Sequence, residues 1–152
     1  MTEIERIVDL MEMAFDGQAW HGPSVMGLLS DVDANQASAR PLKGRHTVWE
    51  LVLHMAAWKT VVRRALGGEK MISLSEEEDW PSIRSQSEAV WRQTVDNLKR
   101  VQKSLVGAVS ELPESRLNET VGGKSYSFYR MIHGVIQHDL YHAGQIAILK
   151  RK

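Results

Sequence analysis

Two histidines stand four residues apart in the segment HDLYHAGQI, which covers residues 138–146. Side chains at this spacing on a helix lie one turn above each other, with about 6 Å between Cβ atoms, so both imidazoles can bind one metal ion. His138 and His142 are therefore candidate metal ligands. The alternative is a pair of core histidines whose ring nitrogens are satisfied by hydrogen bonds.

The position of these rings on their helix indicates that they point inward. At 100° per residue, Met131, Val135 and His142 all fall within about 60° of His138, so the histidines share an apolar face. The same geometry places His54 on the buried face of an earlier helix. A buried imidazole costs about 1–3 kcal/mol per unmet nitrogen, and one shared cation satisfies a nitrogen on each ring. Three nitrogen ligands with open positions are typical of a catalytic or ligand-binding site, because a closed structural site uses four.

Helices are expected to carry these residues. Apolar residues recur at steps of three and four, which is the helical period. The expected helical segments cover residues 2–17, 23–30, one turn within 31–40, 47–67, 83–112 and 125–150. The segment SLSEEEDWPS has no periodicity and is expected to be a solvated acidic loop. No segment alternates as a strand does, so the sequence predicts an all-α fold, an antiparallel four-helix bundle forming a single domain over residues 1–152.

Composition narrows the class of partner. The chain has 152 residues, of which 43% are hydrophobic and 25% charged, as expected for one soluble globular domain. Nineteen basic residues balance nineteen acidic ones, which argues against binding to nucleic acid or to a membrane surface and leaves a small molecule as the expected partner. No secretory signal or membrane span is evident and there is no cysteine, so we expect a cytoplasmic protein.

Four further residues are candidates for contact with a substrate or with the ligand rings. Glu50 is a possible fourth ligand or general base, although its position three residues after Thr47 also fits a helix capping box. Gln145 faces the histidine stripe and is a candidate acceptor for an imidazole N–H. Trp20 is expected to cover the core as a lid. His21 is either a substrate contact at the mouth of the bundle or a turn residue.

The last helix carries a second apolar stripe on the side opposite the histidines. Its members are Tyr129, Ile136, Leu140, Ala143 and Ala147. A helix that is apolar on two sides is buried on two sides. Either another segment of the chain covers this stripe, such as the one after Pro23, or a second copy does. We expect a homodimer through the last helix, because the small alanines permit close approach.

Several segments carry a resemblance to a known family. TVWELVLHMAAWK and HGVIQHDLYHAGQIAILKR, with the shorter AWHGPS and EEDWP, resemble the DinB-like superfamily over nearly the whole chain. This superfamily of metal-dependent helical bundles includes bacillithiol S-transferases and mycothiol-dependent isomerases. The resemblance implies an up-down-down-up bundle, often a homodimer. It also implies that His54, His138 and His142 bind a divalent metal, with nickel, zinc, manganese and iron as the options.

The resemblance implies a chemistry as well. A cation lowers the pKa of a coordinated thiol or water by several units and so provides a nucleophile at neutral pH. The expected function is transfer of a low-molecular-weight thiol to a small electrophile. Metal-dependent hydrolysis is the alternative, and a non-catalytic, stress-associated metal-binding dimer is the third possibility. No general acid or base beyond the ligands is identified, so the catalytic residues stay undefined.

Overall fold

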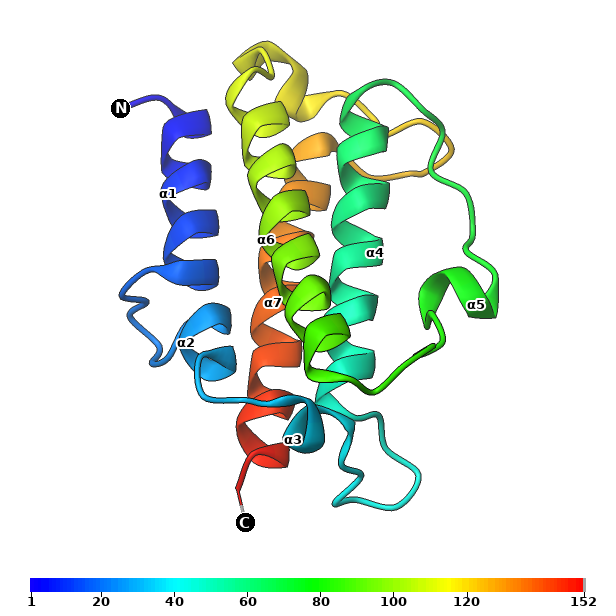
Figure 1. The fold of residues 1–152 in the computed structure, drawn as a ribbon. Helices are drawn as coiled ribbons and strands as arrows, with labels where there is room; N and C mark the ends of the chain where they lie inside the picture. Colours follow the sequence, from blue (N-terminus) through cyan, green and yellow to red (C-terminus); the bar gives the residue numbers. More distant parts are fainter. Residues whose placement is uncertain (152) are drawn as a thin grey trace.

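Four long helices form the body of the protein in a computed structural model that describes residues 1–151 (Figure 1). They are α1 (Glu3–Asp16), α4 (Val48–Leu66), α6 (Glu88–Ser110) and α7 (Phe128–Leu149). The connections carry the short helices α2 (Val25–Leu29), α3 (Ala34–Ser38) and α5 (Glu76–Asp79), and the 3-10 helix η1 (Glu114–Asn118). The described residues form no strand beyond one isolated bridge, so the all-α class is confirmed.

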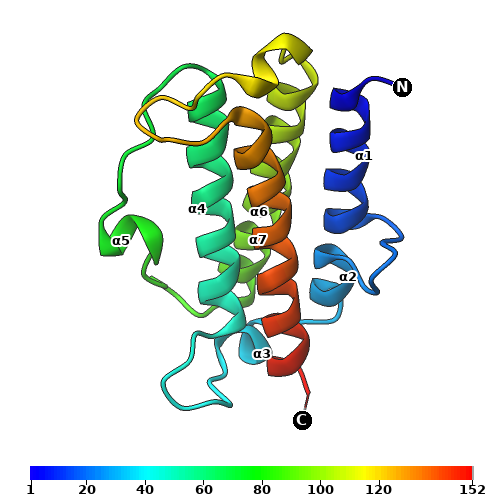
Figure 2. The same cartoon turned by 180° about the vertical axis from the view of Figure 1, so that it is seen from behind.

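The direction of the helices follows from one long connection. In Figures 1 and 2, α1 and α7 run towards one end of the molecule, whereas α4 and α6 run towards the other. Residues 67–87 return along the outside of the bundle from the end of α4 to the start of α6, so these two helices point the same way. α4 packs against both α6 and α7. The groove between α4 and α7 is where the histidines of the two helices can meet.

The core has an apolar part on either side of a polar layer. One apolar cluster includes Ile7, Leu105 and Ile132, and the other includes Trp49 and Leu98. In each of three helices, one buried polar side chain lies between the residues of the two clusters. These side chains are Lys59 of α4, Gln102 of α6 and Asp139 of α7. We call these three residues the polar layer.

The structure corrects the sequence prediction at several boundaries. The segment expected to be only a solvated acidic loop contains the single-turn helix α5, capped by Ser75. The helix expected from residue 83 begins at Glu88 after the N-cap Ser87. The last helix begins at Phe128 rather than near residue 125, because backbone hydrogen bonds hold residues 119–128 in a tight turn before it starts. Residues 114–118, expected to be loop, form η1.

Helices α1 and α2 pack on α7 and so cover part of its second apolar stripe. Ile136 and Ala143 are buried there, while Tyr129 remains 40% exposed. A segment of the same chain therefore covers some of the surface assigned to a second copy. The homodimer stays a prediction.

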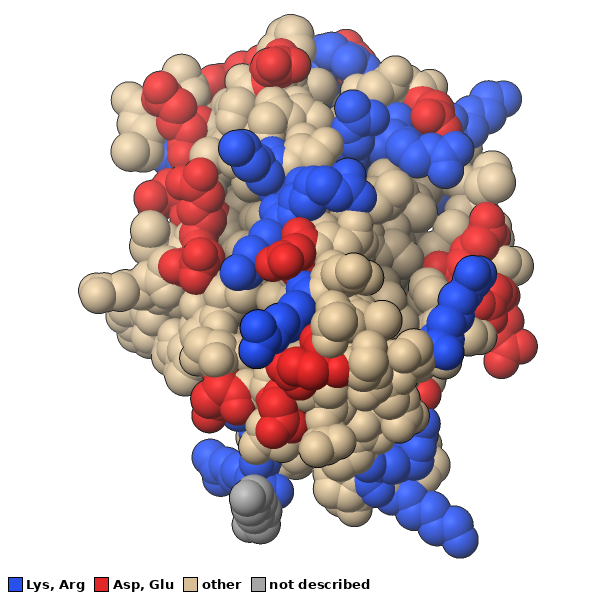
Figure 3. Space-filling view, in the orientation of Figure 1, with Lys and Arg blue, Asp and Glu red and all other residues tan. Residues whose placement is uncertain are grey.

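The surface carries both signs of charge. On the face seen in Figure 3, Lys and Arg side chains are interspersed with Asp and Glu, in keeping with the balanced composition. Among the helices of residues 1–151, none combines the length and the apolar character that a membrane crossing requires.

Candidate metal centre

The three histidines predicted to meet lie together in the groove between α4 and α7. His54 comes from α4, and His138 and His142 come from successive turns of α7. The Nε2 atom of His138 lies 3.0 Å from the Nε2 atom of each of the other two rings. The ligand nitrogens of all three are within 4.8 Å of one another, so the cluster could hold a metal ion. The convergence of the rings is confirmed.

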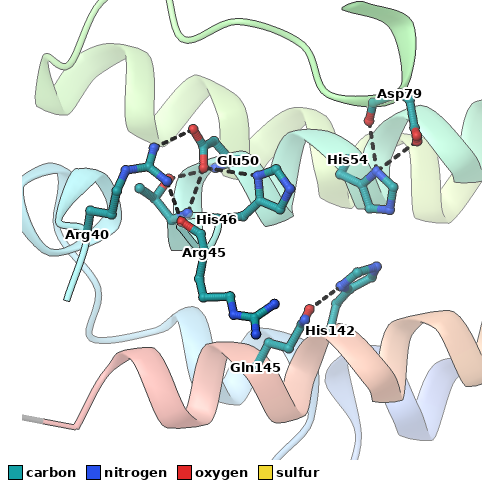
Figure 4. Close-up of polar contacts among 9 residues, drawn as sticks. Arg40, Arg45, His46, Glu50, His54, Asp79, His142 and Gln145 are labelled. Carbon is teal, nitrogen blue, oxygen red and sulfur yellow. Dashed lines mark hydrogen bonds and ion pairs between the residues drawn. The ribbon is translucent and has the colours of Figure 1, made fainter. Parts of the chain in front are cut away.

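The orientation of His54 is fixed from the segment that follows α5. Its Nδ1 atom donates to the backbone oxygen of Asp79 over 2.8 Å and lies 3.1 Å from the Asp79 carboxylate (Figure 4). The indole of Trp58 donates to the same carboxylate over 2.7 Å and holds it in place. Because both Asp79 oxygens are acceptors, the proton of neutral His54 is on Nδ1. Its Nε2 lone pair then points into the cluster.

A second acceptor fixes His142 in the same way. Its Nδ1 atom is 2.5 Å from the side-chain oxygen of Gln145, one turn further along α7 (Figure 4). Gln145 therefore lies where the sequence analysis expected an acceptor for an imidazole N–H. With the proton on Nδ1, the Nε2 atom of His142 also presents a lone pair to the cluster.

His138 cannot satisfy this arrangement by itself. If its proton is on Nε2, one N–H must donate to the Nε2 lone pairs of both His54 and His142. The buried Nδ1 atom of His138 then has no partner within residues 1–151. If the proton is on Nδ1, three Nε2 lone pairs face one another at close range. Either form leaves a buried nitrogen unsatisfied, which costs about 1–3 kcal/mol. A cation bound by the three lone pairs removes this conflict, so the donor set fits a metal ion.

The electrostatics of the cluster keep its rings available as ligands. Burial, together with the neighbouring His142, His54 and Lys59, lowers the pKa of His138 to about 3. Burial also lowers the pKa of His54 and of His142, despite the partners that favour their charged forms. All three imidazoles are therefore neutral at pH 7, the protonation state that metal binding requires.

Trp80 covers the outer side of His54. The two rings are stacked, with centroids 3.9 Å apart and an angle of 7° between their planes. The ring of His46 stacks on Trp80 as well, at 3.4 Å and 5°. Both imidazoles cannot stack so close to the centre of the same face of the indole. His54 and His46 therefore lie on opposite faces of Trp80. The segment after α5 thus forms a wall over the cluster.

The polar layer lies directly behind the cluster, because Asp139 follows His138 in α7. The Lys59 ammonium donates to the Asp139 carboxylate over 2.6 Å and to the Gln102 side-chain oxygen over 2.7 Å. These contacts join α4, α6 and α7 at the level of the histidines. The helices that carry the ligands are therefore tied together by a charged contact as well as by apolar packing.

Glu50 does not join the histidine cluster. Its carboxylate accepts the backbone N–H of Thr47 over 2.7 Å, which completes the predicted capping box. It also pairs with Arg40 at 2.7 Å and lies 3.3 Å from the Nδ1 atom of His46. Every polar contact of Glu50 among residues 1–151 is thus at the start of α4. Its capping role is confirmed, whereas no contact supports a ligand role.

Trp20 and His21 lie in the connection between α1 and α2, and the expectation of a Trp20 lid is wrong. Trp20 is 102% exposed and covers no core residue. His21 borders a hollow with Leu140 and Ala143, on the side of α7 away from the cluster. Neither side chain forms a hydrogen bond or a ring contact with the three histidines of the described chain. A substrate contact by His21 stays a prediction.

Two residues around His54 were missed by the sequence analysis. They are Asp79 and Trp80. Nothing in the local spacing connects residue 79 to residue 54, because the contact depends on the path of a long connection. The one available signal was the tryptophan next to a proline in an otherwise acidic segment, since large apolar side chains in such segments generally pack on something.

Two cavities adjoin the cluster from opposite ends of the groove. The first has a volume of about 250 Å³ and is bordered by His138. The second has a volume of about 410 Å³ and is bordered by Arg45, His46, Tyr141 and Gln145. Of these four, His46 contacts the wall, and Tyr141 and Gln145 contact the ring of His142. Figure 4 shows the Arg45 side chain extending along the groove towards Gln145. The first cavity therefore reaches a ligand ring, whereas the second is bordered by neighbours of the cluster.

Comparison with known proteins gives one match. Neither the curated proteins nor the solved structures include a significant match to this chain. A family model described as the DinB superfamily matches residues 20–146, a range that includes α4, α6 and all three clustered histidines. On the strength of that match over most of its length, this chain belongs to the DinB superfamily.

Proposed function

We propose that this protein binds a divalent metal ion through the Nε2 atoms of His54, His138 and His142, and that it transfers a low-molecular-weight thiol to a small electrophile. The observation that carries the metal site is the convergence of three Nε2 atoms, two of them held with their lone pairs inward by Asp79 and Gln145. Membership of the DinB superfamily supports it. The helix directions in Figure 1 agree with the up-down-down-up bundle that the resemblance implies, and we include that topology in the proposal.

The reaction needs an ionised thiol beside an electrophilic carbon. A bound divalent ion supplies the means, because it lowers the pKa of a thiol that coordinates to it. The thiol gives up its proton to solvent water, its sulfur forms a bond to the electrophilic carbon, and the leaving group departs with the bonding electron pair. The chain contains no cysteine, so the sulfur arrives on a small molecule.

The residues of the chain itself orient the ligands and shape the approach. Asp79 and Gln145 fix the two ring orientations that direct Nε2 inward. The wall formed by Trp80 shields His54 from solvent on its outer side. One cavity is bordered by His138 and a second is bordered by Gln145, the partner of His142. This space for two organic molecules favours a reaction with two organic substrates over hydrolysis, because water needs no second cavity of this size.

Cobalt substitution tests the proposal. Untagged protein is first analysed for bound metal, then loaded with Co²⁺ and titrated with a small thiol such as cysteine or mercaptoethanol. We expect about one ion per chain and a thiol-dependent change in the cobalt absorption spectrum. The variant His142→Ala should lose most of the metal while keeping its helical content. His133→Ala, which removes a histidine of the same helix outside the cluster, is the matched control.

The outcomes separate the candidate functions. Equal metal content in His142→Ala and the parent protein would remove the site as described. A metal that binds but gives no thiol-dependent spectral change would refute the transferase and leave a hydrolytic or a non-catalytic metal site. Consumption of thiol together with a model electrophile, dependent on the metal, is the positive result for transfer.

A further inference from the structure

The smaller cavity beside the cluster has a composition that identifies what it can bind. Its walls are mostly apolar, and its polar side chains are confined to its ends. The residues that border it include the apolar Val62, Met131 and Val135, with Arg130 at one end and His138 at the other. An apolar pocket with a few polar groups at fixed places is the usual form of a small-molecule site.

One face of α7 forms the floor of this cavity. Arg130, Gly134 and His138 are spaced four residues apart, so they follow one another along the helix, and His142 continues the series. Eight residues of helix separate Arg130 from His138 by about 12 Å along the axis. The floor therefore runs from a guanidinium at one end to the ligand cluster at the other.

Gly134 keeps the middle of that floor open. Glycine is less favourable than alanine inside a helix. A Cβ atom added at Gly134 would meet no atom within 4 Å, which means that the space above the helix is empty rather than filled by a neighbour. The glycine thus provides room for a molecule in the groove.

The Arg130 guanidinium is available to an anion. Its one aromatic contact is with the Tyr126 ring, at 5.8 Å from the centroid. No carboxylate of residues 1–151 lies within ion-pair distance of it, although other arginines such as Arg64 and Arg116 have such partners. Tyr126 is held in turn by its hydroxyl, which donates to the Met71 sulfur over 3.1 Å. A fixed ring below a free guanidinium is a suitable receptor for a carboxylate.

From these observations we infer that the cavity binds the organic acceptor substrate, and that this substrate is an apolar carboxylate lying over Gly134 with its carboxylate at Arg130 and its apolar end at His138. The role of the bound molecule as a substrate rests on the proposed transferase function, whereas its binding to the cavity does not. A cavity of 150 Å³ holds benzene, so one of about 250 Å³ holds about ten non-hydrogen atoms. An aryl or branched alkyl acid of that size fits.

Calorimetric titration with cinnamate, an apolar carboxylate of suitable size, tests the inference on the full-length protein with its metal content measured. Cinnamamide serves as the neutral analogue with the same apolar group. We expect cinnamate to bind the parent protein about two- to fivefold more tightly than cinnamamide, because only the acid carries a charge that pairs with the exposed Arg130 guanidinium. The variant Arg130→Gln should reduce cinnamate binding to the level of the amide.

A second variant fills the cavity without disturbing the fold. Gly134→Leu places a side chain in the open space and should abolish binding of both compounds, while the metal content stays at the parent value. Gly107→Leu is the matched control, because Gly107 is also a helical glycine with nothing within 4 Å of an added Cβ atom and borders none of the cavities described here. It should bind cinnamate as the parent does.

Several results would overturn the inference. They are the absence of cinnamate binding to the parent, equal binding of acid and amide, and unchanged binding in Gly134→Leu or Arg130→Gln. Cinnamate binding that survives Arg130→Gln but disappears in metal-free His142→Ala would place the carboxylate at the metal and also refute it. Failure of the proposed transferase would be recognised separately, from the cobalt titration with thiols.

Discussion

Lys59 of α4 and Asp139 of α7 form an ion pair, with 2.6 Å between Nζ and the carboxylate oxygen, although the two side chains are only 1% and 4% exposed. Burial lowers the pKa of the Lys59 ammonium and raises the pKa of the Asp139 carboxyl, while their mutual attraction opposes both shifts. Each group therefore depends on the other, because a lone charge in this position would be desolvated without compensation. The pair connects the two helices that supply the histidines.

Removing one partner of this pair should destabilise the protein strongly. We expect Lys59→Met to lower the free energy of unfolding by about 3–5 kcal/mol, since it leaves the Asp139 carboxyl buried without its counter-charge. Urea denaturation monitored by circular dichroism measures the change. Lys99→Met, at an exposed position of α6, is the control and should change little.

The double variant Lys59→Met/Asp139→Leu should recover much of the lost stability, because it removes both charges and keeps the volume filled. A single variant Lys59→Met that unfolds at the same urea concentration as the parent would contradict this account of the polar layer.

The contact between Gln145 and His142 should determine metal affinity. Gln145→Ala removes the acceptor that holds the His142 proton on Nδ1, so the Nε2 lone pair is no longer fixed towards the cluster. Loss of such a partner typically weakens metal binding 10- to 100-fold, and we expect a decrease within about that range. Competition with a chelator of known affinity provides the measurement. Gln137→Ala, exposed on the same helix, should bind metal as tightly as the parent, and an equal loss in both variants would contradict the assignment.

Glu50 should affect stability and leave the metal in place. Its carboxylate caps α4 and lies with Arg40 and His46, away from the three ligand rings. We expect Glu50→Ala to lower the free energy of unfolding by about 1 kcal/mol, the usual effect of losing a helix cap, with unchanged metal content. Elemental analysis and thermal unfolding on the same sample measure both quantities. A large loss of metal would restore Glu50 as a fourth ligand.

The stability of the metal-free protein should fall in mildly acidic solution. Burial and the neighbouring His142, His54 and Lys59 hold the pKa of His138 at about 3. Burial also lowers the pKa of His54 and His142, whereas in the unfolded chain all three titrate near 6.5. Below about pH 6.5 the unfolded state therefore binds more protons than the folded state, so the free energy of unfolding decreases as the pH falls towards 3. Above that pH the contribution is constant.

Thermal unfolding of metal-free protein between about pH 7 and about pH 5 measures this dependence. Other groups titrate in acid as well, so the comparison is with a variant in which the three histidines are replaced by glutamine. The variant should show a smaller decrease in its unfolding temperature. Parallel curves for the two proteins would refute the role of the histidines.

The helical fold and the inward direction of the three histidines could be predicted because both follow from local periodicity, whereas the family resemblance implied that they bind one metal ion. The position of His54 on the inner side of one helix, and of His138 and His142 on the inner side of another, is fixed by the helical repeat. The start of α6 was predicted too early. Before the N-cap Ser87, the sequence of residues 83–87 does not distinguish extended chain from helix.

The surroundings of the histidines could not be predicted in the same way. Asp79 and Trp80 reach His54 across 25 residues of chain, through a connection whose course depends on tertiary packing. The buried Lys59 likewise looked like an ordinary charged residue of a helix, because its partner Asp139 belongs to a different helix. Contacts of this kind are set by how the elements pack, which a single sequence does not specify.

The wall over His54 belongs to the connection of residues 67–87 and not to a helix of the bundle. Surface connections accept insertions and substitutions that a packed helix does not. Two properties are thereby divided between two parts of the molecule. The bundle sets the positions of the imidazoles, and the surface connection, which we call the strap, limits which molecules reach them. Grafting a different strap between α4 and α6 would be a way to retune selectivity while leaving the scaffold alone.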